Sequence, residues 1–308
     1  MIEIHVDYLN YAHGGMVGAS TREGGAGYDF TGLVRIMANG YRWPDIFVLG
    51  EAEHYEFSGG AGLWGAAAAL RAAGGPAYLP LVGSLPRQWG PVAPVVFVNQ
   101  ARLVVERWYD HRVPDFRATN RNLLIVRPVG GGDALRVVAV HGDLNPLLRE
   151  SDAHDLRRHA SDEHLCLLVG DWNETLSGPE HELRDLNDPN VYDRMWRLAW
   201  KIAWRAGRAE QPYRSTTAAL DYLCGYWDAV RGERVGGVGF RDVCEQAGVL
   251  TPTMLPKPNG RQCGQIDHLL VNAPLAQRVV PGSVRVHPPR DPSHPDSDHN
   301  RLSATVRL

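Results

Sequence analysis

Short runs of apolar and β-branched residues recur along the chain, and glycine, proline or polar residues bound each run. Runs of this length and composition predict β-strands, because branched side chains pack well on a pleated surface and the runs are short for helices. The strands that we expect lie at 2–8, 45–49, 92–98, 103–108, 123–126, 135–140, 165–169, 266–271 and 302–306.

Helical periodicity lies between these runs, and the helices that we expect are 65–73, 147–159, 191–206 and 218–231. Several strands nevertheless follow one another directly, at 92–108 and again at 123–140. Consecutive strands pair most readily as antiparallel neighbours, whereas parallel pairs need long crossovers. The pattern therefore predicts an α/β protein with mixed sheets rather than a doubly wound parallel sheet.

The composition excludes several classes of protein. Hydrophobic residues make up 44% of the 308 positions and the formal net charge is −3, which is too apolar and too balanced for a disordered chain. No run approaches the ~20 apolar residues of a membrane span, and the first residues resemble a strand rather than a leader. We therefore expect a cytoplasmic protein without a membrane span, whose charge gives no bulk attraction to nucleic acid.

Two motifs that suggest other chemistry are excluded by their context. Residues 60–65 match GxGxxG, but ten residues separate this motif from the preceding strand, and no acidic residue lies about twenty positions further on. A dinucleotide site requires both features. The four cysteines are widely spaced and form no CxxC pair, so we expect reduced thiols rather than a zinc site or a disulfide framework.

Polar residues stand at the ends of many of the predicted strands. Any one of them could be a cap or turn residue, because Asx side chains favour such positions. Their recurrence favours a site instead, since a rigid sheet holds side chains at strand ends while the loops leave them accessible. The residues are Asn10, Glu51, His141, Asp171, Asn173, Asp267, Asp298 and His299.

The chemistry of these residues is consistent. Carboxylate and amide oxygens are hard donors that suit Mg²⁺, and also Mn²⁺ or Ca²⁺, better than zinc. A histidine beside a carboxylate is oriented and kept basic by it. A divalent ion together with a His–Asp pair is what metal-assisted hydrolysis of a phosphate ester requires.

The motifs in this order resemble the endonuclease/exonuclease/phosphatase superfamily of deoxyribonuclease-like, metal-dependent phosphoesterases. The resemblance rests on GDxN at 170–173 and SDH at 297–299, together with the strand-end residues, and it spans residues 2–308. It implies a four-layer α/β sandwich, in which two mixed β-sheets pack face to face with helices on the outside. Because the proposed site draws on residues from 10 to 299, we expect a single catalytic domain over 1–308.

The resemblance also implies a metal site. Glu51 would be the principal ligand of a Mg²⁺ ion, supported by Asn10 and Asp298. The first strand ends in Asp7-Tyr8-Leu9-Asn10, so Asp7 is an alternative ligand to Asn10.

The remaining motif residues receive catalytic roles from the same resemblance. Asp171 would orient or deprotonate the attacking water, and Asn173 would hold the phosphate or the metal shell. His299 would be the general acid or base, oriented by Asp267, while His141 would contact the scissile phosphate or the leaving group.

The segment 174–264 is longer than the core of that superfamily needs, and we expect a helical insert rich in Trp and Arg. Tyr192, Trp196, Trp200 and Trp204 recur every four residues and predict one stripe of a helix over 191–208. One interpretation is a Trp stripe packed on the core beside a solvated basic face. The other is a cover over the substrate, in which Arg197 and Lys201 meet phosphate.

Asn120 and Arg121, which precede a predicted strand, are further candidates for binding substrate phosphate, although a solvated surface loop explains them equally well. The leading functional prediction is a nuclease or phosphodiesterase that uses metal-activated water. The alternative is a small-molecule phosphatase or phosphodiesterase acting on a nucleotide, sugar phosphate, inositol phosphate or lipid headgroup. A non-catalytic binding module on the same fold is a third hypothesis. The partner in each case is a phosphate ester, either nucleic acid or a small phosphorylated metabolite, and no obligate protein partner is indicated.

Overall fold

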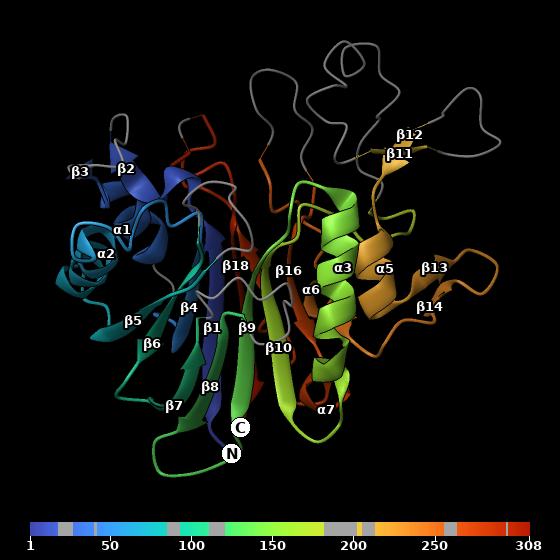
Figure 1. The fold of residues 1–308 in the computed structure, drawn as a ribbon, viewed down its shortest axis with the longest axis horizontal. Coiled ribbons are helices and arrows are strands. Elements are labelled where there is room, and N and C mark those ends of the chain that lie inside the picture. Colours follow the sequence, from blue (N-terminus) through green and yellow to red (C-terminus); the bar gives the residue numbers. More distant parts are fainter. Residues whose placement is uncertain are drawn as a thin grey trace.

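Two six-stranded mixed sheets pack face to face, and helices cover their outer faces (Figure 1). The computed structural model describes residues 1–17, 27–39, 42–84, 93–110, 121–181, 202–204, 213–255, 264–293 and 295–308. The order of strands in the first sheet is β17-β18-β1-β4-β6-β5, and in the second it is β15-β16-β10-β9-β8-β7.

The strands of the first sheet are β1 (Glu3–Asn10), β4 (Ile46–Gly50), β5 (Tyr78–Val82), β6 (Val95–Asn99), β17 (Arg285–His287) and β18 (Arg301–Arg307). Those of the second are β7 (Leu103–Tyr109), β8 (Leu123–Pro128), β9 (Leu135–His141), β10 (Leu165–Asp171), β15 (Arg241–Asp242) and β16 (Asp267–Val271). In the two sheets, β1 pairs with β4 and β9 with β10 in parallel, while the remaining neighbours are antiparallel.

The helices divide between the two outer faces. The first sheet is covered by α1 (Thr31–Met37) and α2 (Ala61–Ala72), and the second by α3 (Pro146–Leu156) and α5 (Ala218–Cys224). Shorter elements are the 3-10 turns η1 (Ala12–Gly15) and η3 (Arg157–Ala160), and the helices α6 (Val243–Gln246) and α7 (Ala273–Ala276). Three small hairpins are β2 (Met16–Val17) with β3 (Gly27–Tyr28), β11 (Ile202–Trp204) with β12 (Tyr213–Ser215), and β13 (Tyr226–Asp228) with β14 (Glu233–Val235).

The alternation of side chains along the strands builds three apolar clusters. In β1, Val6 and Tyr8 point into the core between the sheets, whereas Leu9 points outward against α1 and α2. Each fully buried aliphatic or aromatic side chain contributes about 1.5–3 kcal/mol through removal from water. The central strands therefore carry apolar residues on both faces, which is why they read as continuous hydrophobic runs. The predicted four-layer sandwich is confirmed.

The structure corrects two of the predicted helices. Residues 202–204 form a strand, β11, so the helix predicted over 191–206 is wrong there, while its other residues lie outside the described part of the chain. The four-residue spacing of aromatic side chains suggested a helix, but residues 202–204 pair with β12, and the local spacing does not report that pairing. The helix predicted over 218–231 ends at Cys224, because Gly225 has a φ of 93° and breaks the helix.

Other features match or extend the predictions. Cys166, Cys224 and Cys244 are buried free thiols, and burial raises the pKa of each; Cys263 lies outside the described residues. The sequence pattern did not predict β5, which contains Pro80 and occupies the edge of its sheet, where a missing N–H costs no ladder bond. Within the described ranges, every helix is too short or too polar to cross a lipid bilayer.

Candidate active site

The parallel strand pairs bring four of the predicted residues to one edge of the sandwich. Asn10 at the end of β1 lies opposite Gly50 at the end of β4, so Glu51 follows directly beside it. In the second sheet, His141 at the end of β9 lies opposite Asp171 at the end of β10. Parallel strands end at the same edge, and this edge is therefore where residues from both halves of the chain meet.

Antiparallel neighbours complete the cluster. Because β16 runs against β10, its first residue, Asp267, lies opposite Asp171. The strand β18 runs against β1 and begins at Arg301, so Asp298 and His299, which precede it, arrive at the same edge. Residues separated by almost three hundred positions are thus brought together by strand register.

Asn10 joins the two sheets through its side chain. The fully buried Asn10 donates from Nδ2 to Glu51 Oε1, at 3.1 Å, and to Asp171 Oδ2, also at 3.1 Å. Its own Oδ1 is buried and accepts no hydrogen bond from any residue that the structure describes. The backbone is fixed as well, since Ser297 Oγ donates to the Asn10 carbonyl oxygen at 2.7 Å.

Tyr8 is a residue of the site that the sequence prediction did not include. The Asp171 backbone N–H donates to the Tyr8 hydroxyl oxygen at 2.9 Å, across the interface between the sheets. Burial raises the pKa of Tyr8 well above its ordinary value, and the nearby carboxylates of Asp267, Asp171 and Glu51 raise it further, so the phenol stays neutral. The signal in the sequence is its position two residues before Asn10, which places both side chains on one face of the strand.

His299 and Asp267 form a buried pair beside Asp171. Their Nδ1 and Oδ2 atoms lie 2.7 Å apart, and both side chains are almost fully buried. Burial alone would lower the pKa of His299, but the charge and hydrogen bond of Asp267, with the charges of Asp171 and Asp298, raise it to about 9. The ring is therefore cationic at neutral pH and can donate a proton or stabilise negative charge.

Two site residues have left-handed backbone conformations, which cost energy for residues other than glycine. Glu51 has a φ of 53° and Asn173 a φ of 50°. Asn173 is held by its backbone N–H, which donates to Asp171 Oδ1 at 2.6 Å, and by Nδ2, which donates to the Gly142 carbonyl at 3.0 Å. Gly170 is required in the same motif, because a Cβ there would lie 1.8 Å from the Val140 carbonyl oxygen.

The donor set fits a hard divalent cation. Glu51 and Asp171 supply carboxylates around Asn10, whose buried oxygen otherwise has no partner among the described residues. Asp171, Asp267 and His299 also offer ligand atoms that lie within 4.8 Å of one another. His299 Nδ1 already lies 2.7 Å from Asp267 Oδ2, which places these two residues in a His–Asp pair.

Asp7, the alternative metal ligand, lies away from this cluster. The alternation of the strand turns its side chain to the outer face of the first sheet. There it is fully buried, 3.1 Å from His5 Nε2 and 3.6 Å from Arg301 Nε. Asn10, unlike Asp7, lies at the strand edge with the other predicted residues.

The structure places the remaining predicted residues as follows. His141 is half-buried at the end of β9, and its Nδ1 is buried without a hydrogen-bond partner among the described residues. Asp298 is half-buried next to His299. Arg121 is buried and lies 3.4 Å from Asp152 of α3. Asn120, Arg197 and Lys201 lie outside the described residues.

A cavity of about 320 Å³ adjoins His299 and Ser297 on the side of α1. Its three arginines already have partners: Arg35 forms an ion pair with Asp296, Arg290 donates to Asn39, and Arg301 donates to the Met37 carbonyl. The described lining therefore carries more positive than negative groups, since it contains three arginines and the cationic His299 but only two aspartates, Asp291 and Asp296.

Comparisons with known proteins agree with this architecture. No family model and no curated protein matches the sequence. Among solved structures, an AP endonuclease from Archaeoglobus fulgidus is 14% identical, with a TM-score of 0.54, over 99% of this chain and 100% of that one. A 3'-5' exonuclease (NExo) from Neisseria meningitidis is 14% identical, with a TM-score of 0.53, over 99% and 100%. ANGEL2, a 2',3'-cyclic phosphatase, is 12% identical, with a TM-score of 0.54, over 99% and 96%.

The chain has the endonuclease/exonuclease/phosphatase fold. The resemblance inferred from the GDxN and SDH motifs is confirmed at the level of fold, and it covers essentially the whole chain. In this endonuclease/exonuclease/phosphatase fold, the strand-end cluster around Asn10 and Asp171 occupies one edge of the double sheet.

Proposed function

We propose that this protein is a divalent-metal-dependent phosphoesterase that hydrolyses a phosphodiester, in the manner of a nuclease or phosphodiesterase. The observation that carries the proposal is the bridge that Asn10 makes between Glu51 of the first sheet and Asp171 of the second, beside the His299–Asp267 pair. A binding module would not need buried carboxylates, an unpartnered amide oxygen and a protonated histidine at one strand edge.

Glu51, Asn10 and Asp298 would hold Mg²⁺, with Mn²⁺ or Ca²⁺ as alternatives. When bound, the ion neutralises charge on the phosphoryl oxygens. The buried oxygen of Asn10 and the adjacent Glu51 carboxylate are the groups that support this assignment. The same carboxylates would repel one another without a cation, since like charges at this distance disfavour their charged forms.

The other residues of the cluster perform the proton transfers. The Asp171 carboxylate orients the attacking water and accepts its proton, while the Asn173 amide contacts the phosphate. The cationic His299, held by Asp267, stabilises the charge that develops on the phosphate or protonates the leaving oxygen. His141, on the neighbouring strand, completes the phosphate contacts.

The leading substrate is a nucleic acid. An AP endonuclease and a 3'-5' exonuclease share the fold over the full chain. The second candidate is a small phosphorylated molecule such as a nucleotide, and a different observation favours it. The described cavity beside His299 has a volume of about 320 Å³, which suits a compact ligand, and ANGEL2, a 2',3'-cyclic phosphatase, has the same fold.

The test is a comparison of substrates with Mg²⁺ and with chelator. Nicking of supercoiled plasmid and cleavage of labelled oligonucleotides would be compared with phosphate release from a panel of nucleotides, sugar phosphates and inositol phosphates. We expect hydrolysis that chelator abolishes and that Asp171→Asn reduces at least ~100-fold. The exposed Asp133, which pairs with Arg278, provides the control Asp133→Asn with unchanged activity.

The preferred substrate class decides between the two candidates. Hydrolysis of no ester with any of the three metal ions would contradict the proposal and leave the binding module as the better interpretation. Hydrolysis that persists with chelator and in Asp171→Asn would contradict the assigned site.

A further inference from the structure

The segment 171–177 begins with Asp171, the last residue of β10, contains Asn173, and is attached to surrounding elements along its length. The Trp172 backbone N–H donates to the Ile266 carbonyl at 2.8 Å. Trp172 and Leu176 are buried in the apolar cluster beneath α3 and α5. Further on, two arginines from outside the segment contact it, and neither has a role in the chemistry proposed above.

Arg149 of α3 forms the first of these attachments. Its guanidinium lies 3.7 Å from the carboxylate of Glu174, and both side chains are 1% exposed. Glu174 Oε2 accepts the backbone N–H groups of Ala219, at 2.9 Å, and Leu220, at 3.2 Å, in the first turn of α5. Arg149 also donates to the Asp143 carbonyl at 2.7 Å.

This arrangement connects two loops of the site. The Asp143 carbonyl follows Gly142, whose own carbonyl accepts the Asn173 amide at 3.0 Å. Arg149 therefore contacts both loops that form this hydrogen bond. It donates to Asp143, which follows the acceptor Gly142, and it pairs with Glu174, which follows the donor Asn173. A buried charge costs free energy unless it is paired and hydrogen-bonded, and Arg149 is held in this way by Glu174, Asp143 and Thr216.

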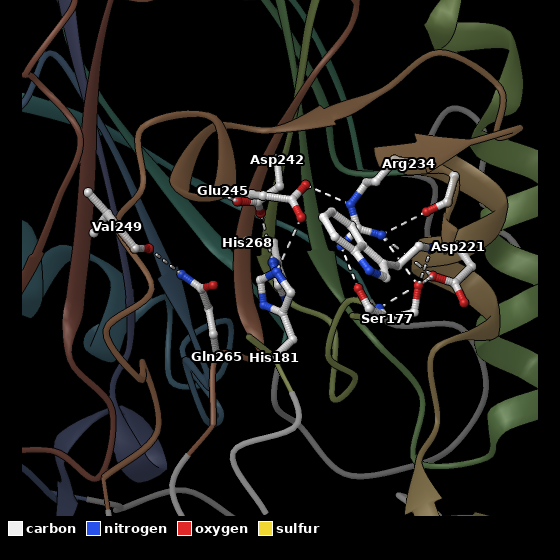
Figure 2. Close-up of polar contacts among 11 residues, drawn as sticks. Ser177, His181, Asp221, Arg234, Asp242, Glu245, Val249, Gln265 and His268 are labelled. Carbon is white, nitrogen blue, oxygen red and sulfur yellow. Dashed lines mark hydrogen bonds and ion pairs between the residues drawn. The ribbon is translucent and has the colours of Figure 1, made fainter. Parts of the chain in front are cut away.

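Arg234 of β14 forms the second attachment, shown in Figure 2. It donates to the Ser177 carbonyl at 2.6 Å, to the Gly225 carbonyl at 2.8 Å and to Glu245 Oε2 at 2.6 Å. Ser177 is held from a second side, because its hydroxyl donates to Asp221 of α5 at 2.6 Å. One guanidinium thus joins Ser177, at the end of the segment, to β14, to Gly225 after α5 and to Glu245 of α6.

A buried histidine adds a third attachment from β16. His268 Nδ1 lies 2.8 Å from Asp242 Oδ2 (Figure 2). Its Nε2 lies 3.2 Å from the Glu174 carbonyl oxygen. Both partners are acceptors, so the ring carries both protons. Burial would lower the pKa of His268, but the hydrogen bond and charge of Asp242 raise it.

The attachments matter because Asn173 has a left-handed backbone, with a φ of 50°, that its own preference does not fix. Catalytic side chains must be held to about 0.5 Å, which requires support from packed and hydrogen-bonded neighbours. We propose that Arg149 and Arg234 are positioning residues that fix the segment 171–177, and with it the placement of Asp171 and Asn173. The proposal rests on the proposed function, since the reaction that benefits is hydrolysis of a phosphate ester at this site.

The test uses variants that keep the fold. Arg149→Lys retains the charge beside Glu174, but a single ammonium cannot also reach the Asp143 carbonyl as the planar fork does. Arg234→Gln removes the contacts to Ser177 and Glu245 from a partly accessible position. The matched control is Arg102→Gln, because Arg102 contacts Asp45 at 3.3 Å and the Glu3 carbonyl at 2.7 Å, at the opposite end of the first sheet.

Two quantities would be measured on each full-length variant, well below its melting temperature. The first is the pair of kinetic constants with Mg²⁺, for which we expect kcat to fall roughly 10- to 100-fold in both site variants while KM changes less than about twofold. The second is amide hydrogen exchange in peptides covering 172–177, which should accelerate in both site variants. Arg102→Gln should leave both quantities unchanged.

The outcomes separate this inference from the proposed function. A kcat within twofold of wild type in Arg234→Gln, unchanged exchange in 172–177, or an equal loss of kcat in Arg102→Gln would each overturn the positioning role. If the wild-type protein hydrolyses no phosphate ester, the proposed function fails. In that case hydrogen exchange still tests whether Arg149 and Arg234 order the segment 171–177. Unchanged exchange in the two variants would show that they do not.

Discussion

At the scale of single residues, Asn10 is an uncharged side chain between two carboxylates from different sheets. Its amide nitrogen donates to Glu51 and Asp171, which leaves the oxygen buried and without a partner among the described residues. A buried amide oxygen without a donor costs about 1–3 kcal/mol, and a bound cation would remove that cost. An aspartate here would instead add a third negative charge.

The first prediction concerns Asn10→Ala, which removes both the bridge and the oxygen. We expect kcat/KM to fall at least ~100-fold and the Mg²⁺ concentration for half-maximal rate to rise, measured by metal titration of the rate. The control is Asn99→Ala. Asn99 is also buried and donates to a carboxylate, Asp45, at 3.3 Å, but it lies at the other end of the sheet. A similar loss of activity in both variants would show that the effect is one of stability.

The second prediction concerns Asp267→Asn. Without the carboxylate, burial lowers the pKa of His299, and the ring loses its orientation and its charge. We expect kcat to fall roughly 10²- to 10⁴-fold with little change in KM, because the interaction acts in the transition state. Steady-state kinetics would test this. A loss confined to KM would instead place His299 in ground-state binding.

At the scale of elements, the strand register does most of the positioning. His141 lies opposite Asp171, and Asp171 lies opposite Asp267, so three neighbouring strands present three titratable groups at one edge. The elements after Asp171 have a different task. The hairpin β13–β14 and the helix α5 contact the segment after β10 through Arg234 and Asp221, and Glu245 of α6 in turn accepts from Arg234. The described part of 174–264 therefore contributes side chains that hold the segment carrying Asn173, rather than side chains of the strand-end cluster itself.

The third prediction concerns the pH dependence of stability at α6. Burial would raise the pKa of Glu245, but hydrogen bonds from His181 and Arg234, together with their charges, lower it to about 2. The folded pKa lies below the unfolded value, so the stabilisation is complete above about pH 4.5 and is lost as pH falls toward 2. When the pH falls from 5 to 2.5, the free energy of unfolding should therefore decrease by about 1–2 kcal/mol less in Glu245→Gln than in wild type. Urea unfolding at both pH values would measure this, and parallel curves for the two proteins would contradict it.

At the scale of the whole molecule, neither sheet contains the site by itself. Glu51 and Asn10 belong to the first sheet, Asp171 and Asp267 to the second, and the Asn10–Asp171 hydrogen bond crosses between them. A cation bound at this edge would link the two sheets and stabilise the folded state by mass action.

The fourth prediction follows from this linkage. At a Mg²⁺ concentration about ten times Kd, the melting temperature should rise by roughly 2–4 °C. Glu51→Gln should abolish the shift, whereas Glu106→Gln, on the surface beside Arg127, should retain it. Differential scanning calorimetry with and without the ion would measure both. An equal shift in the Glu51 variant would place the metal elsewhere.

Several features could be predicted from the sequence because they depend on local patterns. Apolar runs such as 165–169 determine strands by burial on both faces, and polar residues at their ends mark where the strands stop. The order of the GDxN and SDH motifs pointed to the fold that the structure confirms. Adding Tyr8 would have required knowing which face of the first strand meets the second sheet, and only the packed structure shows this.

The sequence by itself determined most strands of the two sheets and the polar residues at their ends, since these follow from periodicity, while the sandwich architecture followed from the resemblance of its motifs to a known family. The tertiary structure decided which side chains meet. It turned Asp7 outward and Asn10 inward, formed a strand at 202–204, and placed Arg149 and Arg234 on the segment after β10. Contacts of this kind join positions up to several hundred residues apart. They depend on register and on the packing of whole layers, which no local pattern encodes.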